Sequence, residues 1–229
     1  MDIGGIPEYL KTNMREHFLS GLKDSNSVDM YEFELFRWFK NETEETWKRM
    51  DCEERQYIKE QVASGAEHIN DSGLFATDYY RSRMRSSHVI FLASLLEGAM
   101  KRECDRLKQA LGAQVLFQPS DLSGDPWKKR KTFLQRYGRL AIPDSVWKPV
   151  KEILDVRNAL VHHSGQVALM TDQQIANLGK IPGIGVDSSE ISINEEYLER
   201  AIDSVREVVE FLHMKINDVI DLALRPRGI

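Results

Sequence analysis

The sequence predicts an all-α protein built as an up-and-down bundle of helices. Apolar residues recur at every third or fourth position over several long segments, which is the period of an amphipathic α-helix. A single stretch, residues 166–193, combines turn-forming glycines with short β-prone pieces. No internal repeat is visible. These observations favour a helical bundle with one small irregular insertion.

The first predicted element is a long amphipathic helix from Val28 to about Ile69. Asp71-Ser72-Gly73 follows it and predicts a break, because short polar residues and glycine favour turns. We therefore expect residues 1–72 to form an N-terminal helical extension. Its large apolar residues at helical spacing are Met30, Phe33, Phe36, Trp38 and Phe39.

The rest of the chain, residues 73–229, is expected to form the bundle. A second long helix is predicted from about Thr77 to Leu111, with Gly112 as its C-terminal cap. A polar loop over residues 118–126 then leads into a short helix over residues 127–137. The apolar face of the long helix consists of Val89, Leu92, Leu96, Ala99, Met100 and Leu107.

Two further helices complete the predicted bundle. One begins at Pro143-Asp144 and reaches about His163, where Ser164-Gly165 ends it. Residues 166–193 are expected to form a long loop or a small hairpin, with β-prone pieces at 167–170 and 190–193. The last helix runs from about residue 194 to 224. Its apolar face consists of Leu198, Ile202, Val205, Val209, Leu212, Ile216 and Ile220.

The composition is that of a folded globular protein without a membrane span. Hydrophobic residues make up 41% and charged residues 29%, a balance that excludes intrinsic disorder as the main state. The longest apolar run, residues 89–96, is far shorter than the roughly 20 residues that a membrane-spanning helix needs. Residues 1–20 carry charges where a secretory signal peptide is apolar. We therefore expect no membrane association and no secretion.

The cysteines and the net charge exclude two further classes of site. Cys52 and Cys104 stand apart without zinc-site spacing, so we expect no metal site and a reducing, cytoplasmic compartment. The net charge of −5 excludes nucleic-acid binding through bulk positive charge. Basic residues do cluster locally, a pattern most typical of a solvated helix face. The two clusters are Arg81, Arg83 and Arg85, and Lys128, Lys129, Arg130 and Lys131.

The segment DVRNALVHHSG, residues 155–165, holds the candidate functional residues. At about 100° per residue, Arg157 falls near the centre of the apolar stripe of its helix. A charge in that position is costly unless it is paired or faces a polar cavity. Asn158 and His162 lie four residues apart on the flank, so they can converge on one ligand beside Arg157. Histidine next to arginine can donate and accept protons beside a phosphate.

This pattern resembles the signature of the HEPN superfamily, in which an arginine is followed by a polar residue, often asparagine, and then by a histidine. Arg157, Asn158 and His162 match that signature. An earlier family helix often reads apolar, apolar, Glu, and the sequence leading to Glu97 is similar to it. The resemblance covers roughly residues 86–224. The bare Arg-to-His spacing also occurs from Arg83 to His88 and from Arg206 to His213, but without the asparagine.

The resemblance implies a metal-independent endoribonuclease with no cofactor, acting on RNA as a homodimer. In such an enzyme His162 would transfer protons, Arg157 would stabilise the phosphate and Asn158 would orient it. One copy of the motif lacks a second proton-transfer group, and two copies facing each other would supply it. The family also implies a bacterial defence or toxin–antitoxin setting, with an antitoxin or defence partner protein.

The same residues also have structural interpretations. Arg157 is expected to form a buried salt bridge with Glu97, the favoured partner, or with Glu103. Asn158 could bond a backbone carbonyl, and His162 could interact with the last carbonyls of its helix. The alternative function is therefore a non-catalytic helical module that binds nucleotide, RNA or a partner protein. A third interpretation is the sensor or neutralised half of a defence pair.

Overall fold

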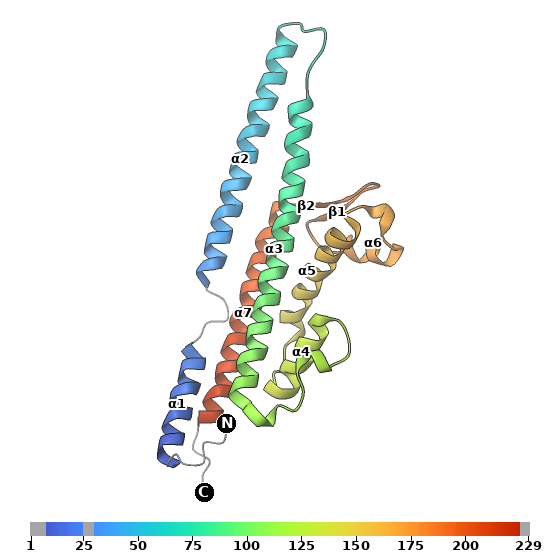
Figure 1. Cartoon of the computed structure of the whole chain (residues 1–229). Coiled ribbons are helices and arrows are strands. Elements are labelled where there is room, and N and C mark those ends of the chain that lie inside the picture. The colour runs from blue at the N-terminus through green and yellow to red at the C-terminus, as the bar shows by residue number, and fades with distance from the viewer. Residues whose placement is uncertain (1–7, 25–29, 225–229) are drawn as a thin grey trace. The chain divides into compact units, whose positions relative to one another are not determined.

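The structure is a computed structural model that describes residues 8–24 and 30–224 (Figure 1). Within these residues it contains seven α-helices and one two-stranded sheet, which confirms the predicted all-α class. The helices are α1 (Glu8–Asp24), α2 (Met30–Ala63), α3 (Ser72–Leu111), α4 (Pro126–Gly138), α5 (Asp144–His163), α6 (Asp172–Leu178) and α7 (Glu195–Leu224). The strands are β1 (Ile184–Val186) and β2 (Ile191–Ile193). None of the described helices combines the length and the apolar character needed to cross a bilayer.

The described chain divides into two compact units. Of the described residues, unit 1 contains 8–24, 95–147 and 207–224, and unit 2 contains 30–94 and 148–206. The predicted boundary at residue 72 is not a boundary of either unit, because α2 and the first part of α3 both belong to unit 2. The long helices α3 and α7 each contribute one part to each unit.

Ion pairs hold α2 in unit 2. The buried Glu44 carboxylate on α2 accepts two hydrogen bonds of 2.6 Å from Arg85 on α3. Burial acts to raise the pKa of Glu44, but the adjacent Arg85 outweighs it and the pKa lies below its usual value. Lys40, 1% exposed, pairs with Glu199 on α7. These buried charges explain why α2, although rich in charged residues, packs as an integral helix of unit 2.

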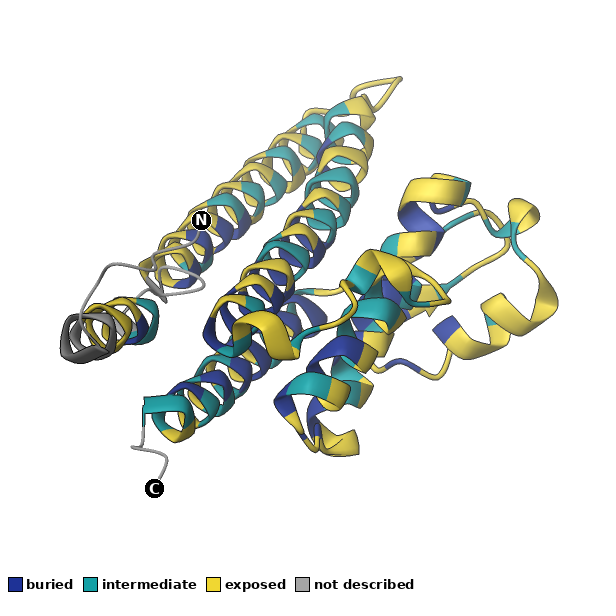
Figure 2. Ribbon diagram, turned by 60° about the horizontal axis from the view of Figure 1, so that its bottom comes forward, coloured by how far each residue is buried: buried dark blue, intermediate teal, exposed yellow. Residues whose placement is uncertain are grey.

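The apolar face of α2 differs in part from the predicted one. Phe33 and Phe36 are buried as expected, whereas Trp38 is 61% and Phe39 48% exposed. Aromatic residues surround the helix in this region, so the spacing alone did not distinguish the buried ones from the exposed ones. In Figure 2 the buried residues follow one side of each long helix, and exposed residues follow the other.

His88 on α3 is enclosed by the aromatic side chains of α2. It is 3% exposed, and its ring lies edge-on to Phe36 and Phe39 at centroid distances of 5.3 and 5.8 Å. Neither ring nitrogen has a hydrogen-bond partner among the described residues. Burial lowers the pKa of His88; nearby Glu44 opposes this effect, and Lys40 and Arg85 add to it. The imidazole is therefore held in an environment that favours its neutral form.

The insertion between α5 and α7 contains the expected hairpin and an additional helix. β1 and β2 pair antiparallel, with Ile184 opposite Ile193. The β-prone piece at 167–170 forms a 3-10 turn, Val167–Leu169, instead of a strand. The short helix α6 was not predicted; it begins at a capping box formed by Thr171 and Gln174. The insertion contributes a small apolar cluster of Leu178, Ile181, Ile184, Ile191 and Ile193.

A buried polar network lies in unit 1. Glu103 on α3, fully buried, pairs with Arg106 at 2.7 Å and with His213 of α7 at 3.2 Å. Arg106 also donates to the carbonyl oxygen of Leu22 on α1 at 2.8 Å and to Asn217 of α7 at 2.6 Å. The network therefore joins α1, α3 and α7 within this unit.

Candidate functional site

The predicted motif occupies the last two turns of α5, and the hairpin fixes the end of that helix. Ser164 and Gly165 have φ angles of 53° and 74°, which terminate the helix where the sequence predicted. The N–H of Gly165 donates to Ala159 O at 3.1 Å, and Gly165 O accepts from the N–H of Ile191 on β2 at 2.9 Å. Glycine suits position 165 because its φ is strained for other residues. These hydrogen bonds fix the end of α5, which carries the motif, against the hairpin of unit 2.

Arg157 is half-buried and is oriented by its neighbour. Its Nη1 donates to Oδ1 of Asn158 at 3.0 Å. No carboxylate in the described part of the chain lies within ion-pair distance of it. The guanidinium charge is therefore not neutralised by an acidic side chain of those residues, which suits it to bind an anion.

The expected partners of Arg157, Glu97 and Glu103, both have other basic partners within unit 1. Glu97 instead accepts from Arg130 on α4 at 3.1 Å, and Glu103 belongs to the buried network with Arg106 and His213. In both cases the basic partner lies in the same unit as the carboxylate, whereas Arg157 belongs to the other unit.

The buried face of α5 also explains why Arg157 needs no carboxylate. In the last two turns this face consists of Val156, Ala159 and Leu160. Val161, although apolar, is 44% exposed. The buried face thus turns away from Arg157 toward the hairpin, where Leu160 and Ile191 both approach Gly165. Arg157 lies at the edge of the apolar stripe, with solvent available to its charge.

Asn158 and His162 are both exposed on the outer side of α5. No described residue forms a hydrogen bond or ion pair with His162, so its ring is accessible to a ligand. The adjacent His163 is half-buried, and its Nε2 lies 3.4 Å from the side-chain amide of Gln174 on α6. The structure thus brings Arg157 and Asn158 into contact and leaves His162 accessible on the next turn.

Sequence reasoning missed one titratable residue beside the motif, Asp155. It precedes Asn158 by three residues and His162 by seven, so all three project from one face of α5. Burial raises the pKa of the half-buried Asp155 carboxyl, and Lys151 opposes the rise. The helical spacing alone could have identified this residue. A carboxyl group with a raised pKa beside the motif is a candidate for proton transfer.

Tyr197 of α7 is a second group that the sequence did not indicate. It is 3% exposed, and its hydroxyl has no hydrogen-bond partner among the described residues. Burial raises its pKa, with further contributions from the carboxylates of Glu152 and Asp155. Tyr197 therefore forms part of the low-dielectric surroundings of Asp155 rather than an accessible reactive group.

The other basic candidates have structural partners. Arg81 donates to Trp47 O, Arg83 pairs with Glu190 at 3.1 Å and Arg85 pairs with Glu44. The first basic cluster thus joins elements of unit 2 and is not a free cationic patch. In the second cluster, Lys131 lies 4.3 Å above the ring of Trp147 and Arg130 pairs with Glu97.

The two weaker Arg-to-His matches are also structural. His88 is buried against α2, and His213 contacts Glu103 in the buried network of unit 1. Arg83 and Arg206 pair with Glu190 and Glu34. Of the three matches, Arg157 to His162 alone combines an arginine without a described acidic partner and an exposed histidine.

A metal centre finds no support in the side chains that the structure describes, because no three His, Cys, Asp or Glu residues among them are grouped as ligands. Comparison with known proteins finds no matching family model, no similar curated protein and no similar solved structure. Functional inference for this chain therefore depends on its own residues.

Proposed function

We propose that the protein is a metal-independent endoribonuclease of the HEPN type, with Arg157, Asn158 and His162 as its site. The observation that carries the proposal is the combination found at the end of α5. A guanidinium that is oriented by Asn158 and has no described acidic partner lies about one helical turn before an exposed histidine. This is the minimum set for binding a phosphodiester and moving a proton beside it.

Cleavage by transesterification requires a base for the ribose 2′-OH, a cation for the developing phosphorane charge and an acid for the 5′-oxygen. Arg157 supplies the cation and His162 one of the proton-transfer groups. The second group comes from His162 of another copy in a composite dimer site, which is the version that we favour. Asp155, on the same helical face, is the alternative source within one copy.

The resemblance supplies the biological setting of the proposal. It places the activity in bacterial defence or a toxin–antitoxin pair, with RNA as substrate and an antitoxin or defence protein as partner. The enzyme that we propose meets its RNA substrate in the cytoplasm.

The decisive experiment measures cleavage of single-stranded RNA by the purified full chain in excess EDTA. We expect products with 2′,3′-cyclic phosphate ends. His162→Ala should abolish cleavage, and Arg157→Ala should lower the rate by about 100- to 1000-fold, as for loss of one electrostatic contact to the transition state. Because Arg157 has no described carboxylate partner, both variants should retain the melting temperature of the wild type.

His163→Ala is the matched control, since it removes a neighbouring histidine that contacts Gln174 instead of facing the motif. It should remain active. Asp155→Asn distinguishes the two sources of the second proton-transfer group: activity survives in a site with two histidines and is lost in a site that uses the carboxyl. Inactivity of the wild type on a broad RNA panel, or activity that depends on added magnesium, would contradict the proposal.

The alternative, a non-catalytic module that binds a partner protein, is favoured by a different observation. The outer face of α2 exposes large apolar side chains close together: Leu35, Trp38 and Phe39 are 45%, 61% and 48% exposed. Exposed aromatic residues of this kind are enriched at protein interfaces. An inactive wild type would leave this function as the better explanation.

A further inference from the structure

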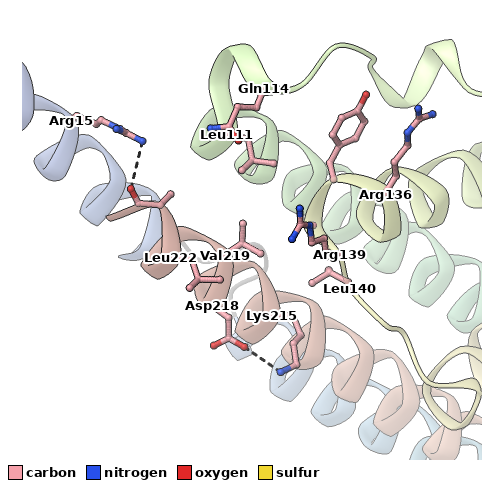
Figure 3. Close-up of a pocket in the computed structure, with 13 residues that line it drawn as sticks. Arg15, Leu111, Gln114, Arg136, Arg139, Leu140, Lys215, Asp218, Val219 and Leu222 are labelled. Carbon is pink, nitrogen blue, oxygen red and sulfur yellow. Dashed lines mark hydrogen bonds and ion pairs between the residues drawn. The ribbon is translucent and has the colours of Figure 1, made fainter. Parts of the chain in front are cut away.

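A cavity of about 580 Å³ lies within unit 1, and none of the motif residues of unit 2 lines it. Its walls come from α1, the C-terminal ends of α3 and α4, and the last turns of α7 (Figure 3). Cavities of about 300–1,000 Å³ are typical of sites for small organic ligands. The volume therefore suits a molecule of the size of a nucleotide.

The lining of the cavity is strongly cationic. Four basic residues, Arg15, Arg136, Arg139 and Lys215, contribute to it, against a single acidic one, Asp218. The chain as a whole carries a net charge of −5, so this concentration of positive charge is local. A site with that imbalance favours an anionic ligand.

The four basic side chains differ in whether their charged groups already contact other groups of the protein. Lys215 pairs with Asp218 at 3.1 Å, and Arg15 donates to the carbonyl oxygen of Ala223 at 3.5 Å. The guanidinium of Arg136 lies over the rings of Phe117 and Tyr137, at 5.5 and 5.9 Å.

Arg139 is the cation with the most capacity for a ligand. It is exposed, and within the described residues its guanidinium forms no ion pair and no hydrogen bond. Figure 3 shows Arg139 between the ends of α3 and α7, facing the hollow that these elements enclose.

The backbone holds Arg139 in an unusual conformation. Arg139 follows the last residue of α4 with φ 51° and ψ 31°, in the left-handed region. Gly138, immediately before it, packs so closely that a Cβ there would lie 3.0 Å from Leu140 and 3.2 Å from Leu107. The left-handed region costs a non-glycine residue energy that the surrounding structure must offset. Glycine is the usual residue in this conformation at the end of a helix. Here an arginine occupies the position and places a cation at the entrance of the cavity.

Part of the cavity lining is apolar and is called the apolar wall below. Leu111 of α3 and Leu140 contribute to it on one side of the cavity, and Val219 and Leu222 of α7 on the other (Figure 3). Leu222 is 61% exposed. An inorganic anion would leave this wall unused, whereas an anion that carries a ring or another apolar portion would cover it.

We propose that this cavity binds a small organic phosphate, a nucleoside polyphosphate being the best match. Arg139 and Lys215 bind its phosphate groups, and its base packs against the apolar wall beside Val219 and Leu222. Arginine is suited to this role because its planar fork donates two hydrogen bonds to one phosphate. The proposal does not depend on ribonuclease activity, since none of its residues belongs to the motif on α5.

Calorimetric titration of the full chain with ATP in EDTA tests the proposal. ATP should bind more tightly than adenosine or tripolyphosphate. Adenosine offers only the base for the apolar wall, and tripolyphosphate offers only the phosphates for the basic residues. A short 2′-O-methyl oligonucleotide, which resists cleavage, should not displace ATP, because the proposed RNA site on α5 does not share residues with the cavity. Affinity for ATP should fall as salt is added, because the interaction is electrostatic.

Arg139→Gly is the key variant, because glycine adopts the left-handed conformation without strain and the fold is retained. It should weaken ATP binding about tenfold or more, the effect of losing one charged hydrogen bond. Val219→Glu should weaken binding as well by placing a carboxylate on the apolar wall. Lys101→Ala, which removes an exposed cation of unit 1 outside the cavity, should leave the affinity unchanged.

Four results would overturn the proposal: no binding of ATP, an unchanged affinity in Arg139→Gly, tripolyphosphate binding as tight as that of ATP, or binding of the oligonucleotide alone. None of them bears on RNA cleavage by His162, so the two proposals succeed or fail separately.

Discussion

At the scale of single residues, His88 links the stability of unit 2 to pH. Its ring is enclosed by Phe36 and Phe39, and neither nitrogen has a hydrogen-bond partner among the described residues. Protonation in that environment would leave a buried charge, partly opposed by Glu44 and further disfavoured by Lys40 and Arg85. Unfolding exposes the imidazole to water, where the charged form is stable.

The first prediction follows from the sign of this shift. The folded pKa lies below the ordinary value of 6.5, so between the two pKa values the unfolded chain binds more protons than the folded one. The contribution to stability is complete above about pH 6.5 and declines as the pH falls toward the folded pKa. Thermal unfolding from pH 7.5 to 5 should show a falling melting temperature, and His88→Leu should flatten that fall. An equally steep pH dependence in the variant would contradict the assignment.

Single residues also show which features of the candidate site could be predicted from the sequence and which could not. The position of the motif at the end of α5 could be predicted, because helical periodicity and Ser164-Gly165 define that end. The partner of Arg157 could not, because a hydrogen bond to Asn158 depends on which side of α5 the hairpin covers. The spacing between Asp155 and the motif can be seen in the sequence, but the burial of its side chain depends on how the elements pack. The roles of all these residues in RNA cleavage remain predictions.

At the scale of secondary-structure elements, buried ion pairs decide how α2 packs. Glu44 with Arg85, and Lys40 with Glu199, link α2 to α3 and α7 within unit 2. Buried pairs of this kind add little net stability relative to apolar packing, but losing one partner leaves a costly uncompensated charge. The attachment of α2 should therefore be sensitive to single substitutions.

We predict that Arg85→Ala lowers the free energy of unfolding by about 3–5 kcal/mol, because the buried Glu44 carboxylate loses its partner. The measurement is chemical denaturation at pH 7. The double variant Arg85→Ala with Glu44→Gln should recover part of the loss, since no charge is then buried. Arg55→Ala, which removes an exposed pair with Asp51 inside α2, is the control and should resemble the wild type. A wild-type value for Arg85→Ala would show that the pair does not hold α2.

Elements were predictable to the extent that they repeat a helical period. The long helices α2, α3, α5 and α7 extend over enough turns for their apolar stripes to be recognised. The seven-residue helix α6 offers fewer than two turns, too short for a periodic signal, and its capping box was the available indication. The hairpin was predicted from its glycines and β-prone residues, but β1 lies beyond the piece at 167–170 that the sequence favoured.

At the scale of the whole molecule, two units are interleaved along the chain. Unit 2 combines residues 30–94 with 148–206, so its cohesion depends on contacts between segments far apart in sequence. Periodicity reveals which face of a helix is buried, but it does not identify the helix that covers that face. The division into two units could therefore not be predicted from the sequence. The expected N-terminal extension, residues 1–72, does not correspond to either unit.

The proposed composite site predicts that the protein is a homodimer in solution. A specific interface should bury at least about 1,000 Å² in total. Light scattering coupled to size exclusion should report twice the mass of 26.4 kDa at tens of micromolar protein. A monomer at that concentration, together with active wild-type enzyme, would rule out the composite site and favour Asp155 as the second proton-transfer group.

The interleaving of the two units also determines the order in which the chain can fold during synthesis. All segments of unit 2 have left the ribosome once residue 206 has emerged, whereas unit 1 still requires residues 207–224 of α7. Domains tend to fold as soon as their segments are available. Residues 95–147 therefore emerge before the part of α7 that completes unit 1, with the apolar surfaces of α3 and α4 not yet covered by it. During that interval the nascent chain is most in need of a chaperone.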